Sequence, residues 1–462
     1  MTNFWGSDVW GSFLVLGLLL GSLLIANVLK RSIPFLRKSL IPHSVLAGIL
    51  ILVAEGIYKL ASGGQVMFDA PVFGTNATAF LEILTYHTLA LGFIASTLKS
   101  GGGKLTKKRT VEIFNTGVTT VSTYLLQAVV GFGITILASF VIKGFFKAAG
   151  VLLPFGFGQG TGQAMNYGTI YETDYGFAGG KSFGLTIAAL GFLSASIGGV
   201  IHLNWMRRKG KIRWENNKDV RNNEQVEREN EIPMQESIDK LTIQVALIAV
   251  AYILAYVLMY LLGLLLPGMK SVNYGFNFLL GVLTATLLKV CMNGLKKVGI
   301  IHREYMNDFL LTRTSNFFFD LMVVAGIAAI RLDTLENYWG IMLILGIVGL
   351  VITYAYNYFV AKKLFPEYTQ EQFLMMYGML TGTASTGTIL LREADGEFKT
   401  PAADNMVYQN FPAIVFGFPM MLLATLAPQK PYLTLIILVA FFAVMNVILF
   451  RSFIFKKKKK AE

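Results

Sequence analysis

Apolar runs of about 20 residues, the length of a helix that crosses a bilayer, recur from one end of this 462-residue chain to the other. Hydrophobic residues make up 54% of the sequence and charged residues only 15%, whereas soluble proteins carry roughly 25% charged residues. Such a chain has too few charged residues to cover its surface in water. We therefore expect an all-α polytopic membrane protein.

The apolar runs predict about 11 transmembrane helices. Two further stretches, 150–172 and 373–391, are too polar or too short to cross a bilayer comfortably. The spans are expected at residues 10–29, 40–60, 80–98, 113–142, 182–205, 241–266, 273–292, 314–331, 338–361, 405–427 and 432–455. The first run has no basic residue ahead of it, unlike a signal peptide, and we interpret it as a retained transmembrane helix.

The distribution of basic residues predicts the orientation of the chain. The net charge of +13 is divided among short loops, so it does not form the single basic face that nucleic-acid binding requires. When the N-terminus is placed outside, 33 of the 40 Lys and Arg residues fall in inner loops. Basic residues favour the cytoplasmic side, so we expect the N-terminus outside and the C-terminus inside. The run 456–460 follows the last span and is interpreted as a lipid-facing anchor, not a nuclear signal.

A charged, weakly apolar segment divides the chain almost in half. We expect 207–240 to be a cytoplasmic linker between an N-terminal five-helix half, 1–206, and a C-terminal half, 241–428. Residues 429–462 then form an extra helix with a basic tail. The spans of the two halves correspond at a nearly constant offset. Since the first half has an odd number of spans, the second begins on the opposite side of the membrane. This predicts an inverted repeat, a plan typical of secondary transporters.

Each half carries one of the two polar stretches between its fourth and fifth span. The first contains Pro-Phe-Gly-Phe-Gly-Gln-Gly-Thr-Gly from residue 154, and the second contains Leu-Thr-Gly-Thr-Ala-Ser-Thr-Gly-Thr from residue 380. Glycine permits a tight reversal and a close approach to the backbone. Non-helical backbone at membrane depth is stable only where it is buried in protein or lines a wet cavity. We therefore predict two re-entrant hairpins that insert from opposite faces. The alternatives are extramembrane loops or small-residue packing faces.

Hairpins of this kind can hold a cation and an anion side by side. Freed carbonyls and hydroxyls are the hard oxygen ligands that a sodium ion takes, and a helix N-terminus offers amide donors to a carboxylate. Candidate sodium ligands are Gly158, Gln159, Thr381, Gly382 and Asp320. Candidate substrate-binding residues are Gly160, Thr161, Gly162, Asn166, Thr383, Ser385, Thr386 and Arg392.

Two of these candidates, Asp320 and Arg392, could instead have a structural role, and the fourth span carries a further polar pattern. Asp320 lies about one turn inside the eighth span, where a charge is usually functional, but it could pair with Arg313 at the membrane edge. Arg392 could clamp a carboxylate, or pair with Glu393 or Asp395 at the cytoplasmic surface. Thr116, Thr120, Thr123 and Gln127 recur at helical spacing in the fourth span, and this polar stripe is expected to face inward.

Several function classes are excluded by the residues. The lone Cys291 permits neither an internal disulfide nor a multi-cysteine metal site. Gly101-Gly102-Gly103-Lys104 lacks the P-loop spacing, and the glycines after Phe157 lack the dinucleotide fingerprint. The sequence shows no pairing of a nucleophile with a base that would indicate an enzyme. Transport would then use an ion gradient or simple facilitation.

At this level the chain resembles the bacterial sodium:glutamate symporters. The resemblance covers essentially the whole chain and rests on Gly158, Gly160, Thr161 and Gly168 in the first stretch and on Gly382, Thr383 and Ala384 in the second. The family pattern is Gly-Gly-His-Gly-Thr; here Phe157 replaces the first Gly and Gln159 replaces the His.

The resemblance implies sodium-coupled uptake of glutamate by alternating access, in a homodimer in the bacterial inner membrane, with sodium as the coupling ion and no other cofactor. The expected partners are a small anionic amino acid, sodium and the lipid bilayer, without nucleic acid. A symporter of another carboxylate such as citrate, or an uncoupled channel or sensor on the same scaffold, remains an alternative.

Overall fold

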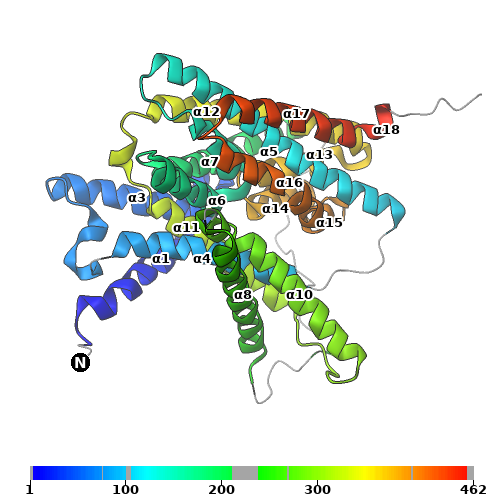
Figure 1. The fold of residues 1–462 in the computed structure, drawn as a ribbon, viewed down its shortest axis with the longest axis horizontal. Coiled ribbons are helices and arrows are strands. Elements are labelled where there is room, and N and C mark those ends of the chain that lie inside the picture. Colours follow the sequence, from blue (N-terminus) through cyan, green and yellow to red (C-terminus); the bar gives the residue numbers. More distant parts are fainter. Residues whose placement is uncertain are drawn as a thin grey trace, which may run out of the picture. The chain divides into compact units, whose positions relative to one another are not determined.

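In a computed structural model, the protein is described over residues 4–74, 76–99, 106–210, 231, 238–267, 270–396 and 399–454. Within these ranges the regular elements are helices, shown in chain order in Figure 1, and an isolated bridge joins Glu231 to Glu304. Most of the predicted linker 207–240 and the basic run 456–460 lie outside the described residues.

The described helices confirm the predicted number of spans. Ten are long and apolar enough to cross a membrane, and a bent pair would make an eleventh. The ten are α1 (Ser7–Ser32), α3 (His43–Ala61), α4 (Ala77–Leu98), α5 (Lys107–Val141), α7 (Gly180–Arg208), α8 (Lys240–Leu265), α10 (Asn277–Lys297), α11 (Asp308–Ala328), α12 (Trp339–Leu364) and α17 (Pro431–Leu449). The shorter elements are α2 (Pro34–Lys38), η1 (Met67–Asp69), η2 (Pro71–Phe73), η3 (Lys147–Val151), α9 (Lys270–Gly275), η5 (Leu332–Leu335), η6 (Pro366–Tyr368) and α18 (Arg451–Ile454).

The span predicted at 405–427 is bent. It is formed by α15 (Ala402–Tyr408) and α16 (Asn410–Leu426), which meet at an angle of 50°. Pro412 lies in the first turn of α16, and a proline ring clashes with the carbonyl four residues earlier. That carbonyl belongs to Tyr408, so the proline explains why the first helix ends there.

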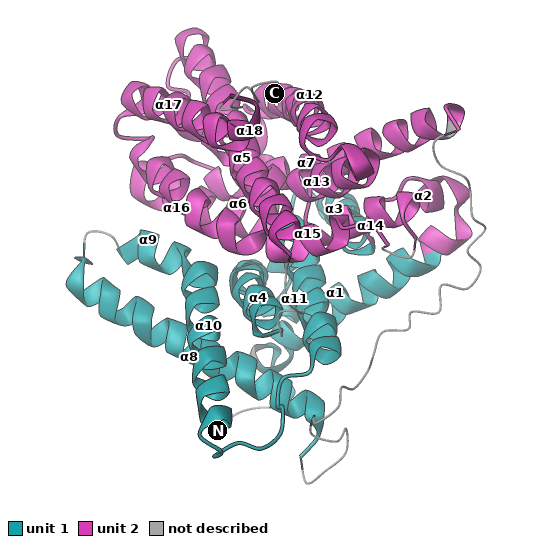
Figure 2. Cartoon of the chain, turned by 90° about the vertical axis from the view of Figure 1, so that its right-hand side faces the viewer, with its two compact units in different colours: residues 1–28, 43–104, 221–329 teal, residues 29–42, 105–220, 330–462 magenta. Residues whose placement is uncertain are grey.

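The chain forms two compact units, coloured separately in Figure 2. Unit 1 comprises Met1–Val28, His43–Lys104 and Arg221–Ala329, and unit 2 comprises Leu29–Pro42, Leu105–Val220 and Ile330–Glu462. Each unit therefore draws segments from both sequence halves. The division into compact units does not test whether the two sequence halves are related by inverted topology, so the inverted repeat stays a prediction.

Unit 1 is built around α11, which packs against α3 and α4. Its close approaches depend on small residues: a Cβ on Gly48 would lie 2.6 Å from the Ile327 side chain, and one on Gly92 would lie 2.7 Å from the Phe319 ring. A second cluster, which includes Ile94, joins α4 to α8 and α10.

Unit 2 contains both polar stretches. The first forms α6 (Leu152–Tyr175), which packs mainly against α7, and the second forms α13 (Thr369–Thr381) and α14 (Ala384–Ala394), which pack against each other. The long helices α5 and α12 also contact α6 and α13.

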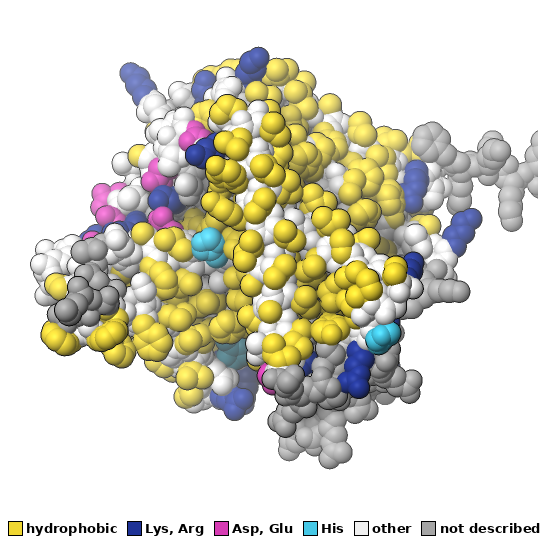
Figure 3. All heavy atoms as spheres, turned by 60° about the horizontal axis from the view of Figure 1, so that its bottom comes forward, with side chains coloured by type: hydrophobic (Ala, Val, Ile, Leu, Met, Phe, Trp, Pro, Cys, Tyr) yellow, Lys and Arg dark blue, Asp and Glu magenta, His cyan; other side chains and the backbone are white. Residues whose placement is uncertain are grey.

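The outer surface is apolar. Hydrophobic side chains cover most of the face drawn in Figure 3, and Lys and Arg side chains gather at its margins. Large hydrophobic side chains of α8 such as Ile253, Leu264 and Leu265 are more than half exposed. Apolar patches of this extent are not stable in water, so they are expected to face lipid tails.

Candidate functional site

The first polar stretch folds as a helical hairpin. Gly160 interrupts α6 with φ 78° and ψ −170°, a conformation that is essentially restricted to glycine. The rings of Phe155 and Tyr167 stack with their centroids 3.9 Å apart and their planes 12° apart. In a straight helix these two residues would be separated by about 18 Å along the axis. The stacking therefore requires the two arms of α6 to fold back on each other.

The second stretch folds in the same manner. Gly382 and Thr383 lie between α13 and α14 and have non-helical backbone angles. A Cβ on Gly378 would lie 2.9 Å from the Cα of Gly387, and a Cβ on Gly387 would lie 2.7 Å from the carbonyl oxygen of Met375. Glycine at both positions lets the two backbones touch, so this stretch is also a helical hairpin.

The breaks of the two hairpins lie next to each other on α7. A Cβ built on Gly191 would lie 2.6 Å from the carbonyl oxygen of Thr381 and 3.1 Å from the Cα of Phe157. Thr381 directly precedes the second break, and Phe157 lies three residues before the first. The structure thus brings the two predicted stretches to one place within unit 2, whereas their insertion from opposite membrane faces stays a prediction.

Side chains of α5 bind the backbone at both breaks. The Tyr124 hydroxyl donates to the carbonyl of Gly158 at 3.0 Å. The Gln127 Nε2 donates to the carbonyl of Leu380 at 2.9 Å and to the Thr353 Oγ1 of α12 at 2.8 Å. Two of the carbonyls freed by the breaks therefore already accept a hydrogen bond, although each keeps a second lone pair for another donor or a cation.

The polar stripe predicted on α5 faces the protein interior, as expected. Thr116, Thr120, Thr123 and Gln127 are all at most 1% exposed. Thr116 accepts a hydrogen bond from Gln372 of α13 at 3.1 Å, and Thr120 donates to Gln409 at 2.9 Å. Thr123 lies 3.5 Å from the Asn357 Oδ1 of α12. The stripe therefore packs against the elements that carry or support the second hairpin.

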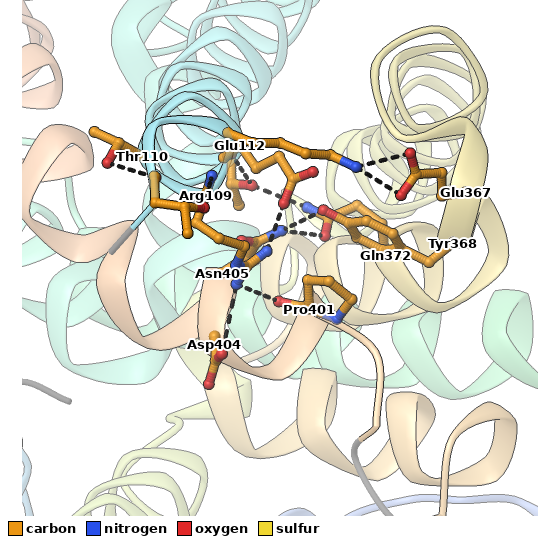
Figure 4. A network of polar contacts seen from close by, with 12 residues as sticks. Arg109, Thr110, Glu112, Glu367, Tyr368, Gln372, Pro401, Asp404 and Asn405 are labelled. Atoms are coloured by element: carbon orange, nitrogen blue, oxygen red, sulfur yellow. Dashed lines mark hydrogen bonds and ion pairs between the residues drawn. The ribbon is translucent and has the colours of Figure 1, made fainter. Parts of the chain in front are cut away.

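The stripe begins in a network at the start of α5, drawn in Figure 4. There the Arg109 guanidinium pairs with Glu112 and donates to the carbonyl of Pro401 at 3.2 Å. The Asn405 Nδ2 of α15 donates to the Tyr368 hydroxyl and to the Gln372 Oε1, both at 3.0 Å. These contacts connect α5 and α15 to α13, the first arm of the second hairpin.

The predicted site residues differ in their surroundings. Those that are buried are Gly158, Gly160, Thr161, Gly162, Asn166, Thr381, Gly382 and Thr386. Gln159, Thr383 and Ser385 are partly exposed, and Arg392 is exposed. Asp320 lies in unit 1, on α11, and is partly exposed. The structure therefore brings together the hairpin residues within one unit, and Asp320 belongs to the other.

Some polar groups near the breaks were not singled out from the sequence. The Tyr124 hydroxyl binds the first hairpin directly, and the Thr353 hydroxyl accepts a hydrogen bond from Gln127, which binds the second. Gln163 lies just past the first break. The Thr386 Oγ1 and both amide atoms of Gln163 are buried without a hydrogen-bond partner among the described residues. Tyr124 follows the helical spacing of the polar stripe, and Thr353 lies next to the tyrosine-rich end of α12, so both could have been found from the sequence. The unpaired amide of Gln163 is evident only from the folded structure.

Comparison with known proteins identifies the family. A sequence model described as sodium/glutamate symporter matches residues 11–370. The chain belongs to the sodium/glutamate symporter family. Membership confirms the predicted class, a multi-pass membrane transporter and not an enzyme. The match includes the whole first hairpin and ends just inside α13.

Individual relatives are more distant. The sodium/glutamate symporters of Escherichia coli K12 and Shigella flexneri are each 27% identical to this chain over 186 residues. That alignment covers 39% of this chain and 41% of each relative. The chain thus matches less than half the length of these relatives.

Proposed function

We propose that this protein takes up glutamate by sodium-coupled alternating access. The observation that supports this most directly is the meeting of two broken helices at Gly191 in one compact unit. Discontinuous helices that meet near the midplane form the substrate and ion sites of many secondary transporters. The family match supports sodium as the coupling ion.

In this proposal each break supplies ligands for both the substrate and sodium. The helix arm that starts at Thr161 and the helix α14 that starts at Ala384 direct backbone amides and a positive dipole end toward a carboxylate. Gly160, Thr161, Gly162, Asn166, Thr383, Ser385, Thr386 and Arg392 are the proposed substrate-binding residues. Sodium would take oxygens at Gly158, Gln159, Thr381 and Gly382, with Asp320 as a further candidate.

The transport cycle in this proposal moves the hairpins relative to the rest of the protein. One hairpin opens toward each side of the membrane, with the N-terminus outside and the C-terminus in the cytoplasm. The inverted repeat, the homodimer and the bacterial inner membrane are parts of the same proposal.

A symporter of another small carboxylate is the second candidate. Gln159 stands where the family pattern has His, and most of the second hairpin lies beyond the family match. A panel of glutamate, aspartate, glutarate and citrate, tested in proteoliposomes with sodium and proton gradients imposed separately, distinguishes the two candidates. The proposal expects the highest uptake for glutamate under the sodium gradient. Preference for citrate, or coupling to the proton gradient alone, would contradict it.

A further inference from the structure

Gln163 carries an amide that the protein leaves unpaired. Its side chain is 1% exposed, and neither its Nε2 nor its Oε1 has a hydrogen-bond partner among the described residues. Other buried amides of unit 2 have at least one partner: Gln372 bonds to Thr116 and Asn405, and the Gln127 Nε2 bonds to Thr353 and Leu380, although the Gln127 Oε1 has none among the described residues. An amide buried with no partner is unfavourable in protein and more so within a membrane, so a group of complementary chemistry is expected to bind it.

The position of Gln163 places this amide at the first hairpin break. Gly160 has non-helical angles, and the second arm continues as a helix from Thr161 to Tyr175. Gln163 is thus in the first turn of that arm, where backbone N–H groups lack helical acceptors. Side chains of a helix lean toward its N-terminus, so the amide of Gln163 leans toward the same break.

The amide has a donor and an acceptor side by side. An α-amino acid presents the matching pair, since its carboxylate accepts and its ammonium donates from neighbouring atoms. A dicarboxylate without an amino group could use the Nε2 donor, but it would leave the Oε1 unpaired or opposite a carboxylate oxygen. Sites built to hydrogen-bond a substrate group discriminate strongly against analogues that lack it.

We propose that the Gln163 amide binds the α-carboxylate and the α-ammonium of the substrate, and that it selects amino acids over dicarboxylates that lack the amino group. This inference rests on the proposed function and assigns the recognition of the substrate's amino-acid end to one side chain of the first hairpin.

The test is sodium-dependent binding of glutamate and of glutarate, its analogue without the amino group, to the purified full-length protein. Gln163→Met keeps the length of the side chain and removes both polar atoms. It is expected to weaken glutamate binding about tenfold or more and to change glutarate binding much less, so that the preference for glutamate collapses. Thr434→Val is the matched control, because the Thr434 Oγ1 on α17 is also buried and unpartnered, and it should bind both ligands as the wild type does.

A second variant gives the opposite change in preference. Gln163→Glu keeps an acceptor for the ammonium and repels a carboxylate, so glutarate should lose more affinity than glutamate and the preference for glutamate should increase. The two variants separate recognition from folding, since a structural defect would weaken both ligands in both proteins.

Each outcome has a distinct meaning. Wild-type affinity for glutamate in Gln163→Met, or equal loss of both ligands, would overturn the assignment to Gln163 and leave the proposed function intact. Equal affinity of the wild-type protein for glutarate and glutamate would also overturn the assignment. A wild-type protein that binds no glutamate in sodium would overturn the proposed function together with this inference.

Discussion

Replacing Gly191 by alanine tests whether the two hairpin breaks meet on α7. The added Cβ would lie 2.6 Å from the carbonyl oxygen of Thr381 and 3.1 Å from the Cα of Phe157. Both neighbours are backbone atoms that no rotamer change can move, so one hairpin must shift. Overpacking of this kind costs about 1–3 kcal/mol. Alanine also recovers about 1 kcal/mol of helix propensity relative to glycine.

Gly133→Ala on α5 is the matched control, because a Cβ there has no neighbour within 4 Å. It gains the same helix propensity without the contact. The free energy of unfolding in detergent should therefore be about 1–3 kcal/mol lower for Gly191→Ala than for Gly133→Ala. Uptake should fall about tenfold to a hundredfold in Gly191→Ala, because a displacement near 1 Å at a binding site has effects of that size, and stay unchanged in Gly133→Ala. Equal stability and equal uptake of the two variants would refute the contact at Gly191.

Two further predictions concern the network at α5 and the insertion of the hairpins. Arg109→Met should lower the free energy of unfolding by about 3 kcal/mol, because it leaves the largely buried Glu112 without its ion pair. Lys108→Met is the control. It removes an ion pair in which both Lys108 and Glu367 are largely exposed, so it should change thermal stability little. The insertion of the hairpins can be tested with single cysteines at Gln159 and at Ser385, both partly exposed, in a Cys291→Ser background. An impermeant thiol reagent should label one of them from one side of the membrane and the other from the opposite side. Labelling of both from the same side would contradict the opposed insertion.

The number of membrane-spanning helices could be predicted from the sequence, because apolar runs of about 20 residues rarely form anything other than a transmembrane helix. The ends of the helices were less predictable. Helix α5 begins at Lys107, several residues before the apolar run at 113, because the polar first turns are held by Arg109 and its partners. The bend after Tyr408 was missed, although Pro412 carries the signal for it.

The candidate site was predictable in its location and less so in its contacts. Glycine and threonine content, repeated at equivalent places in the two halves, identified both hairpins. The meeting of the breaks at Gly191 depends on tertiary packing between α6, α7 and α13, which no local pattern specifies. The same applies to Gln163, whose amide is unusual only because the folded unit gives it no partner.

Sodium-driven accumulation of glutamate is the most direct test of the central claim. Purified protein in potassium-loaded proteoliposomes is exposed to labelled glutamate in sodium or in potassium buffer. The proposed mechanism predicts accumulation above the external concentration in sodium and none in potassium. Equal uptake in the two buffers would contradict it.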